Sequence, residues 1–449
     1  MEKRRDFIKK VAVGSAGLAI GGTAFGFSAK SYKNIQGAND RIRMGIIGVN
    51  GRGNGMGRNF SQQKNVEVAT VCDVDTRALE KAIKSIMSSN TPPANTPKAE
   101  KDCRKVCEDK SIDAIYTATP DHWHAPLTIM GCQAGKHVYV EKPLSHNPRE
   151  GELAVAAARK YNRVVQMGAQ RRSAPLLTQG IEELHKGIIG RVYLAKTWYT
   201  NMRKETFLKP GPIPTWLDYD LWQGPAPRVP FKEGLIHYNW HWFWNWGTGE
   251  ALNNGTHEID VARWGLGVNF PIHVTSVGGR YHFKDDWETP DTQVVTWDYP
   301  GRVSLMWECR SCNGRSIEGS DRGIIFYGEK GSLDTGNDSY KVYDLGGKLI
   351  KEVNNKTAES VQGRDTANPS PGMDVLHISN FLDSIRNNRR PNEDVEDGYK
   401  STMAAQLGNI AWRVGHDLKL DPQNGHIIGD KEAEKLWSRE YEKGWEPKV

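Results

Sequence analysis

The chain has 449 residues, of which 38% are hydrophobic and 25% charged. This length predicts about two or three domains, and the composition excludes a collagen-like, a disordered or a disulfide-scaffold protein. The formal net charge is +6, but six of the 60 basic and two of the 54 acidic residues lie in the first 30 positions, which leaves a net charge of only +2 on the rest. A body so close to neutral indicates that nucleic acid is not the partner.

The first residues have the composition of an export signal. Arg4 and Arg5 lie in a charged head, and an uncharged stretch with five glycines follows at residues 11–27. This order is typical of a signal peptide, and the adjacent arginines followed by Phe-Ile-Lys resemble a twin-arginine signal. The alternative, a basic amphipathic helix, is disfavoured by the glycines. We expect residues 1–40 to be export signal and linker, and the protein to be periplasmic or otherwise exported, without stable membrane insertion afterwards.

The next segment has the order of a dinucleotide-binding unit. A strand is predicted at residues 41–48, glycines recur from Gly48 to Gly57, and a second strand at residues 66–73 ends in Asp73. Glycines let the backbone approach a pyrophosphate, and the following helix presents its N-terminus to that charge. Asp73 can accept hydrogen bonds from a ribose diol and would repel a 2′-phosphate, so NAD is expected rather than NADP. Asn50 takes the place of the middle glycine, and asparagine tolerates a left-handed backbone.

Alternating elements continue this unit to about residue 168. Helices are predicted at 78–87, 123–134 and 148–161, and strands at 113–120, 137–141 and 164–168. The alternation predicts a parallel sheet, in which ligands bind beyond the carboxyl ends of the strands. Three polar clusters follow such strand ends: Asp121, His122, Trp123 and His124; Glu141, Lys142 and Pro143; and Gln170, Arg171 and Arg172.

An aromatic segment lies in the second half of the chain. Between residues 237 and 246, tryptophan occurs at every second position, and in a strand these side chains would share one face. Such a face can stack on a sugar, or it can pack in a core or an interface. Arg171 and Arg172 can bind hydroxyls or an acid group of a substrate, or form salt bridges.

Metal binding is a weaker interpretation of the histidines and cysteines. His122, His124, His237, His241 and His257 have loose spacings, and no metal is expected. Cys309 and Cys312 have the spacing of a metal knuckle, but no second pair accompanies them. The strand-like residues 303–307 favour structural thiols or one local disulfide.

Several of these stretches resemble the glucose–fructose oxidoreductase / inositol dehydrogenase family, written Gfo/Idh/MocA. They are residues 46–53, 118–124, 135–143, 255–260 and 380–383. The resemblance implies a Rossmann domain at 41–168 and an α/β domain at 169–449 with a large open, mostly antiparallel sheet. That sheet commonly serves oligomerisation, so a homo-oligomer is expected. Helices predicted at 377–387 and 398–415 would return to the first domain, and residues 431–449 form a solvated tail or an oligomer contact.

The resemblance also implies roles for single residues. The catalytic lysine of the family corresponds to Lys142, with a cis bond to Pro143, and its catalytic histidine corresponds to His257. Where the family often has an aspartate four residues earlier, this chain has Asn253. His257 can accept a proton near neutral pH, Lys142 can supply a cation, and Asn253 can orient a hydroxyl. Without the family pattern, Lys142 reads as a surface ion pair and His257 as a helix residue.

The resulting hypothesis is an NAD(P)-dependent oxidoreductase that transfers hydride from a ring hydroxyl of a sugar, with the cofactor held tightly because NAD is scarce outside the inner membrane. The alternatives are an NAD-dependent glycoside-cleaving enzyme that works by transient C3 oxidation and elimination, and a sugar-binding protein without net redox activity. The expected cofactor residues are Gly48, Asn50, Gly51, Arg52, Gly53, Asp73, Thr119, Pro120, His122, His124, Glu141 and Lys142. The expected substrate residues are Gln170, Arg171, Arg172, Trp240, His241, Asn253 and His257.

Overall fold

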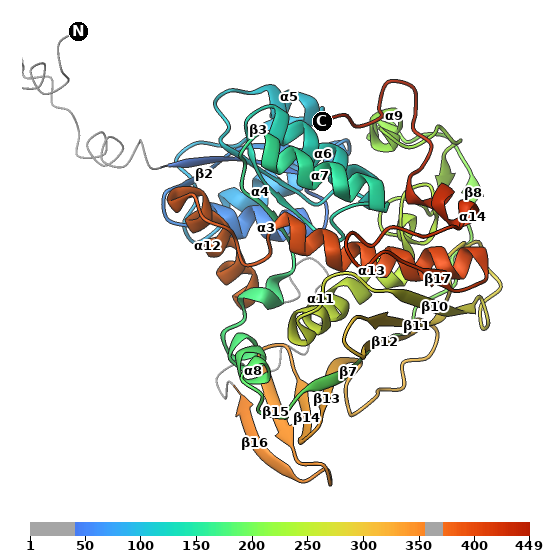
Figure 1. Ribbon diagram of the computed structural model, residues 1–449. Helices are drawn as coiled ribbons and strands as arrows, with labels where there is room; N and C mark the ends of the chain where they lie inside the picture. The colour runs from blue at the N-terminus through green and yellow to red at the C-terminus, as the bar shows by residue number, and fades with distance from the viewer. Residues whose placement is uncertain (1–40, 355–370) are drawn as a thin grey trace, which may run out of the picture. The chain divides into compact units, whose positions relative to one another are not determined.

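The computed structural model describes residues 41–354 and 371–449 (Figure 1). The predicted export signal at residues 1–40 lies outside the described residues. Residues Ile42–Val449 form one structural unit. Among the helices of the described part, none is long and apolar enough to cross a membrane.

The first half of this unit is built on a six-stranded sheet whose strands are all parallel. Its order is β3-β2-β1-β4-β5-β6. The strands are β1 (Ile42–Ile47), β2 (Val66–Cys72), β3 (Lys98–Glu100), β4 (Ala114–Thr117), β5 (His137–Val140) and β6 (Val165–Met167). The predicted parallel sheet is confirmed. Strand β3 was not predicted, because two of its three residues are charged.

Five helices cover the two faces of this sheet. They are α3 (Arg52–Ser61), α4 (Thr76–Met87), α5 (Cys103–Glu108), α6 (Asp121–Gln133) and α7 (Pro148–Lys160). Because side chains alternate along a strand, Met44 and Ile46 of β1 belong to the core under α3 and α4, whereas Ile47 belongs to the core under α5, α6 and α7. Figure 1 shows these two groups of helices on opposite sides of the strands. All three predicted helices are present.

The second half contains a nine-stranded sheet of order β16-β15-β14-β13-β7-β12-β11-β10-β17. Only the β7–β12 pair is parallel, so the prediction of a mostly antiparallel sheet is confirmed. The strands are β7 (Val192–Thr200), β10 (His273–Gly279), β11 (Thr292–Tyr299), β12 (Val303–Arg310), β13 (Arg322–Gly328), β14 (Gly331–Thr335), β15 (Ser339–Tyr343), β16 (Leu349–Asn354) and β17 (Leu418–Lys419).

Helices cover one face of this second sheet. They include η2 (Gln170–Ser173), α8 (Pro175–His185), α10 (Gly249–Asn253) and α11 (Gly255–Leu266). Short elements complete this half: β8 (Lys209–Pro210), β9 (Lys232–Glu233), α9 (Tyr219–Gln223) and η3 (Asn239–Trp242). Cys309 and Cys312 are free thiols, of which Cys309 is buried in the sheet.

The alternating tryptophans are not in a strand. Residues Asn239–Trp242 form a 3-10 helix, and the rest of this segment is turn. The four indoles therefore point in different directions: Trp240 stacks on His241, Trp242 stacks on Trp287, and Trp246 lies against Trp222. The prediction of one shared aromatic face is wrong, because the alternation of side chains that it assumed exists only in an extended backbone.

The C-terminal segment returns to the first domain. Helix α12 (Pro371–Asn387) packs beside α3, and α13 (Val395–Val414) packs against both α7 and β10. The last part, with α14 (Lys431–Glu434) and η4 (Lys435–Trp437), is no solvated tail. Arg439 donates to the buried Glu150 of α7 at 2.8 Å, and Trp445 packs edge-on against Trp123 of α6.

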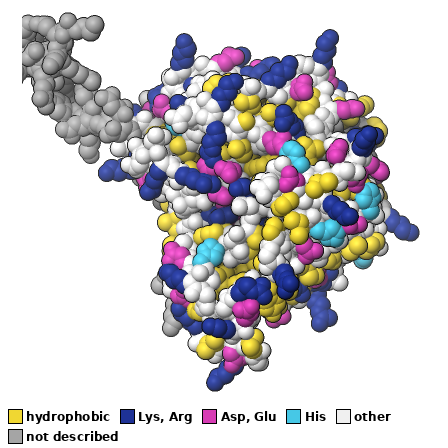
Figure 2. All heavy atoms as spheres, in the orientation of Figure 1, with side chains coloured by type: hydrophobic (Ala, Val, Ile, Leu, Met, Phe, Trp, Pro, Cys, Tyr) yellow, Lys and Arg dark blue, Asp and Glu magenta, His cyan; other side chains and the backbone are white. Residues whose placement is uncertain are grey.

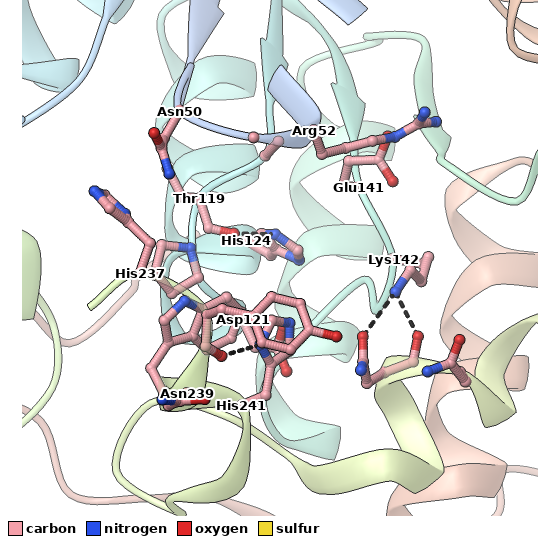
Figure 3. Close-up of a pocket in the computed structure, with 18 of the residues that line it drawn as sticks. Asn50, Arg52, Thr119, Asp121, His124, Glu141, Lys142, His237, Asn239 and His241 are labelled. Carbon is pink, nitrogen blue, oxygen red and sulfur yellow. Dashed lines mark hydrogen bonds and ion pairs between the residues drawn. The ribbon is translucent and has the colours of Figure 1, made fainter. Parts of the chain in front are cut away.

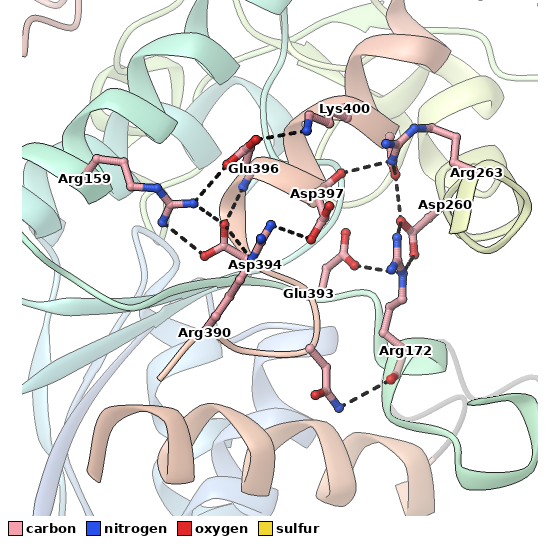
Figure 4. Close-up of polar contacts among 12 residues, drawn as sticks. Arg159, Arg172, Asp260, Arg263, Arg390, Glu393, Asp394, Glu396, Asp397 and Lys400 are labelled. Atoms are coloured by element: carbon pink, nitrogen blue, oxygen red, sulfur yellow. Dashed lines mark hydrogen bonds and ion pairs between the residues drawn. The ribbon is translucent and has the colours of Figure 1, made fainter. Parts of the chain in front are cut away.

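An interior ion network uses one of the arginines expected at the substrate site (Figure 4). Nη2 and Nε of Arg172 donate to the two oxygens of Asp260, at 2.7 and 2.8 Å, and Nε also lies 3.0 Å from Glu393. All three side chains are almost fully buried. Arg172 therefore holds η2, α11 and the segment before α13 together, and we no longer assign it to substrate.

This arrangement predicts a stability defect for Arg172→Met. The substitution leaves the carboxylates of Asp260 and Glu393 buried without their cation, which should cost about 3–5 kcal/mol of unfolding free energy. Urea unfolding measures it, with Arg191→Met as control, because Arg191 pairs with Glu329 on the surface and should contribute less than about 1 kcal/mol. Equal stability of the two variants would contradict the assignment.

Candidate active site

A pocket lies beyond the carboxyl ends of the parallel strands (Figure 3). Its volume is about 1170 Å³, and both halves of the chain line it. This is above the usual size for one drug-like ligand, so it has room for a dinucleotide together with a small substrate. The position agrees with the rule that such sheets bind ligands at this edge.

Most of the residues expected at the site line this pocket together. They are Gly48, Asn50, Gly51, Arg52, Asp73, Thr119, Pro120, His124, Glu141, Lys142, Gln170, Arg171, Trp240, His241, Asn253 and His257. Gly53, His122 and Arg172 are not part of its lining. Lys142 and His257, 115 positions apart in the chain, thus face one cavity.

His122 is a correction. It is fully buried, its Nε2 lies 3.0 Å from the carbonyl oxygen of Trp222, and its Nδ1 lies 3.3 Å from that of Trp246. Burial lowers the pKa of His122 to about 3, so the ring is neutral and holds α6 against the aromatic segment. Within the described residues, no group of three His, Cys, Asp or Glu side chains is arranged to hold a metal ion.

The glycine turn fits the approach of a pyrophosphate. A Cβ on Gly53 would lie 1.8 Å from the Gly48 carbonyl oxygen, and Gly48 itself has φ of 78° and touches the backbone after β4. Gly51, in contrast, faces open space, and no side chain caps the first turn of α3. Its N–H groups are therefore available to an anion. The left-handed residue is Gly48, and Asn50 has no positive φ.

Asp73 lies where a ribose diol would be recognised. It lines the pocket, and its two oxygens accept the Val49 and Asp75 N–H groups at 2.7 and 3.0 Å. Burial raises the pKa of this carboxyl, although the two N–H groups oppose the shift. A carboxylate has about four acceptor positions, so two remain for a diol. Together with the glycine turn, this donor and acceptor set fits NAD.

Arg52 has a different part from the one expected. Its guanidinium donates to both oxygens of Asp374 in α12, at 2.6 and 2.7 Å, and its Nε donates to Glu141 at 2.9 Å. Tyr116 donates to the same Glu141 oxygen at 3.0 Å. Arg52 therefore fixes the Glu141 carboxylate at the wall of the pocket and ties the turn to α12.

The loop that carries Lys142 is held from both sides. The Lys142–Pro143 bond is cis, as the resemblance implied. His124 of α6 bridges two carbonyl oxygens, that of Pro143 at 2.6 Å and that of Thr119 at 2.8 Å. Because this ring connects the loops after β4 and β5, the lysine leaves the strand end in a fixed direction.

Lys142 meets the second domain at Asn253 (Figure 3). Its ammonium donates to the backbone carbonyl of Asn253 and lies 3.3 Å from the side-chain Oδ1. Burial lowers the pKa of Lys142, while the charges of Glu141, Asp121 and Glu250 act in the opposite direction. The lysine is thus a proton donor whose charge is only partly compensated.

Glu250 explains why an amide at position 253 suits this chain. Asn253 donates from Nδ2 to Glu250 at 3.3 Å, which leaves its Oδ1 for Lys142. Burial opposes the charge of Glu250, but the charge and hydrogen bonds of Arg203 hold the pKa of this carboxyl below its usual range. An aspartate at 253 would place two carboxylates together. Glu250 lies behind Asn253 as seen from the lysine, and its negative charge still acts on Lys142.

The neighbours of His257 are positively charged. Burial lowers the pKa of His257 well below its usual value, and the charges of Lys142, Arg322 and Arg171 lower it further. The imidazole is therefore neutral near pH 7 and can accept a proton. Its ring is partly exposed within the pocket.

Sequence reasoning missed several residues of this end of the pocket. Arg203 after β7, Arg322 at the start of β13 and Asn254 line the pocket, and Glu250 lies behind its wall, where it accepts a hydrogen bond from Asn253. No motif marked the two arginines, since they reach the pocket only through the order of the strands in the second sheet. The position of Glu250, three residues before Asn253, was a usable signal, because residues three apart share a helix face.

A segment of the second domain covers the nucleotide side of the pocket. Trp222, His237, Tyr238 and Trp240 line it there. His237 Nε2 donates to Asp75 Oδ2 at 2.9 Å, next to the end of β2. The backbone of the segment also pairs with that loop, since Thr76 N–H donates to the Trp216 carbonyl at 3.1 Å. The cover is thus attached to the first domain.

Comparison with protein families gives two matches that together span most of the chain. Residues 42–169 match the model described as oxidoreductase family, NAD-binding Rossmann fold, and residues 189–447 match the model of the same family's C-terminal alpha/beta domain. The chain belongs to the Gfo/Idh/MocA oxidoreductase family. Its first domain is therefore an NAD-binding Rossmann domain of an NAD-dependent oxidoreductase family.

Curated proteins resemble parts of the chain at low identity. A glycosyl hydrolase family 109 protein of Saccharopolyspora erythraea is 28% identical over 214 residues, which are 45% of this chain and 46% of that protein. The match thus spans less than half of this curated relative.

Solved structures resemble the chain over most of its length. The aldose-aldose oxidoreductase of Caulobacter crescentus, complexed with glycerol, has 17% identity and a TM-score of 0.63 over 85% of this chain and all of that one. A levoglucosan dehydrogenase complexed with NADH and levoglucosan has 16% identity and a TM-score of 0.64 over 84% and 99%. At these identities the likeness concerns the fold.

The contact between Lys142 and Asn253 predicts a pH effect. Asn253→Asp adds a negative charge beside the ammonium, which raises the pKa of Lys142, so the alkaline limit of cofactor reduction should move to higher pH. Asn313→Asp, in an exposed loop, should leave it in place. The measurement is the rate of nicotinamide reduction against pH, and an unchanged limit in Asn253→Asp would show that Lys142 does not set it.

Proposed function

We propose that the protein oxidises a ring hydroxyl of a sugar or sugar derivative by hydride transfer to NAD. The observation that carries this proposal is that Lys142, Asn253 and His257 line the same pocket as the glycine turn and Asp73. Structural relatives named as an aldose-aldose oxidoreductase and a levoglucosan dehydrogenase support a carbohydrate as substrate.

The residues divide the chemistry between them. NAD, held by the glycine turn and Asp73, would supply the acceptor for the hydride of the carbon that carries the hydroxyl. His257, neutral because burial and neighbouring cations lower its pKa, accepts the hydroxyl proton. The Lys142 ammonium donates a hydrogen bond to the same oxygen and stabilises its developing negative charge. Asn253 orients that ammonium through its carbonyl oxygen.

The proposal predicts opposite results for binding and reaction in Lys142→Met. Removal of the cation should lower the rate of cofactor reduction by sugars about 10²–10⁴-fold, the usual contribution of such a group. The nucleotide bound per chain should stay as in the unmodified protein, because the hydrogen bonds of the Lys142 ammonium go to Asn253 and not to the glycine turn. Lys186→Met, an exposed residue, is the control. A variant that still reduces its cofactor at the normal rate would refute the role of Lys142.

A second candidate is glycoside cleavage without net redox change. The curated relative named as a glycosyl hydrolase favours it. Oxidation at C3 would make the C2–H acidic, a base would remove that proton, and the aglycone would leave with the bonding electrons; addition of water and return of the hydride then restore NAD. Release of nitrophenolate from a nitrophenyl glycoside over many turnovers, with no added acceptor, would select this route. Sugar binding with neither signal would leave a binding protein.

We further propose that the protein is exported through a twin-arginine signal and retains its NAD. The sequence of the leader supports export, and the cover from Trp216 to Trp240, attached to Asp75 and Thr76, supports retention. A cofactor loaded before export does not need to be replaced where free NAD is scarce.

One preparation tests both parts. The protein is purified from the periplasmic fraction and denatured, and the released nucleotide is counted. About one NAD per chain is expected, because enclosed cofactors dissociate slowly with their lids closed. Protein found only in the cytoplasmic fraction would refute export, and exported protein that needs added NAD would refute retention.

Self-association is also proposed. The face of the nine-stranded sheet opposite α11 carries half-exposed apolar side chains, among them Leu194, Val294 and Met306, and the family resemblance implies that this sheet joins copies of the chain. On the face drawn in Figure 2, basic, acidic and apolar side chains are mixed. A solution mass of one chain by light scattering would refute the homo-oligomer.

A further inference from the structure

Cationic side chains gather at the end of the pocket next to His257. Three cationic side chains line it, Lys142 from the end of β5, Arg171 from η2 and Arg322 from β13. Behind the wall lies the fully buried Glu258, 3.5 Å from Arg171 Nη1 and 3.7 Å from Arg322 Nε. Asp321 also lines the pocket. Asp121 lines the pocket as well, and its charge acts on Lys142 together with those of Glu141 and Glu250. The two arginines therefore have Glu258 and Asp321 near them, and their hydrogen bonds decide whether the guanidinium charges are paired.

The carboxylate of Glu258 forms no hydrogen bond with either guanidinium. Both distances exceed those of a hydrogen bond, and neither Glu258 oxygen has a hydrogen-bond partner among the described residues. The hydrogen bonds of the two arginines go to neutral groups instead. Arg322 donates to Asn254 Oδ1 at 2.7 Å, and Arg171 donates to the Gly336 carbonyl at 2.8 Å. Lys142 likewise donates to neutral oxygens.

Among the described residues, the other charges nearby leave the guanidinium groups of Arg171 and Arg322 without a hydrogen-bonded carboxylate. Arg203 is paired with Glu250 through two hydrogen bonds, so this pair is neutral as a whole. Burial raises the pKa of Glu258, which weakens its negative charge although the arginines oppose the shift. Burial is the largest cause of the lowered pKa of His257, and the charges of Lys142, Arg322 and Arg171 lower it further.

We infer that the substrate carries an anionic oxygen group, a carboxylate or a phosphate, that Arg322 binds at the end of the pocket next to His257. This rests on the proposed oxidation of a sugar and narrows its substrate class to acidic sugars. The Arg322 side chain is 28% exposed and can reach a ligand, whereas the Arg171 side chain is 6% exposed and contributes charge from behind. A guanidinium presents paired N–H groups that match the oxygens of either anion.

The test compares matched sugars on the protein with its bound cofactor. Glucose and galactose are set against their uronates and their 6-phosphates, while the absorbance of reduced nicotinamide is followed. The acidic members should act at concentrations at least about tenfold lower, and high salt should reduce this preference. The uronates and the phosphates, compared with each other, identify the anion. Equal action of the neutral sugars overturns the inference and leaves the proposed function intact.

Substitution then locates the preference. Arg322→Gln should raise the concentration needed of the acidic sugar about 30-fold or more and that of the neutral one less than about threefold. Arg322→Lys, which keeps the charge, should recover part of the loss, and Arg191→Gln on the surface should change neither. An equal loss for both sugars overturns the assignment of Arg322. If no sugar of either kind reduces the bound cofactor, the proposed function fails instead. If a variant does not fold, the comparison of acidic with neutral sugars and its dependence on salt still decide whether the substrate is an anion.

Discussion

The site depends on the hydrogen bonds that join Lys142, at the end of a strand of the first domain, to Asn253, at the end of a helix of the second. A lysine ammonium is strongly hydrated, and its burial costs free energy unless polar atoms replace the water. Here the replacing oxygens come from the other half of the chain. The two halves must therefore be correctly positioned against each other before these oxygens can replace the water around the ammonium. The position of Lys142 thus depends on the folding of the whole unit.

Much of the surrounding structure maintains this relative position of the two halves. The ion network of Arg172, Asp260 and Glu393 ties η2 to α11, the helix that begins two residues after Asn253. Arg52 connects the glycine turn both to Glu141, the neighbour of Lys142, and to Asp374 of the returning helix α12. Charged side chains whose place in the sequence suggests ligand binding are used here to fix the position of the residues that line the pocket. Burial decides between binding a ligand and forming an ion pair within the protein, because a buried charge needs a partner at close range.

Asn253 illustrates how a departure from a family pattern can be understood from its neighbours. Taken alone, an amide in place of a carboxylate removes a negative charge from beside the lysine. In the structure Glu250 lies one step behind, held in its charged form by Arg203, and the amide fits between carboxylate and ammonium because it has both a donor and an acceptor. The altered residue is part of a longer chain of polar groups, in which the amide joins the Lys142 ammonium to the Glu250 carboxylate.

The sequence by itself determined the elements whose signals are local. The parallel sheet, the glycine turn, Asp73 and the strand-end position of Lys142 follow from hydrophobic periodicity and turn chemistry over short windows. The tertiary structure alone decided which polar side chains face the pocket. His122 and Arg172 lie beside pocket-lining residues in the sequence, but their side chains are buried in the interior. Trp240 and Trp242 lie in a 3-10 helix, and Arg203 and Arg322 reach the pocket from distant strands. The physical reason is that side-chain direction and charge pairing depend on contacts between segments far apart in the chain, and no local pattern records those contacts.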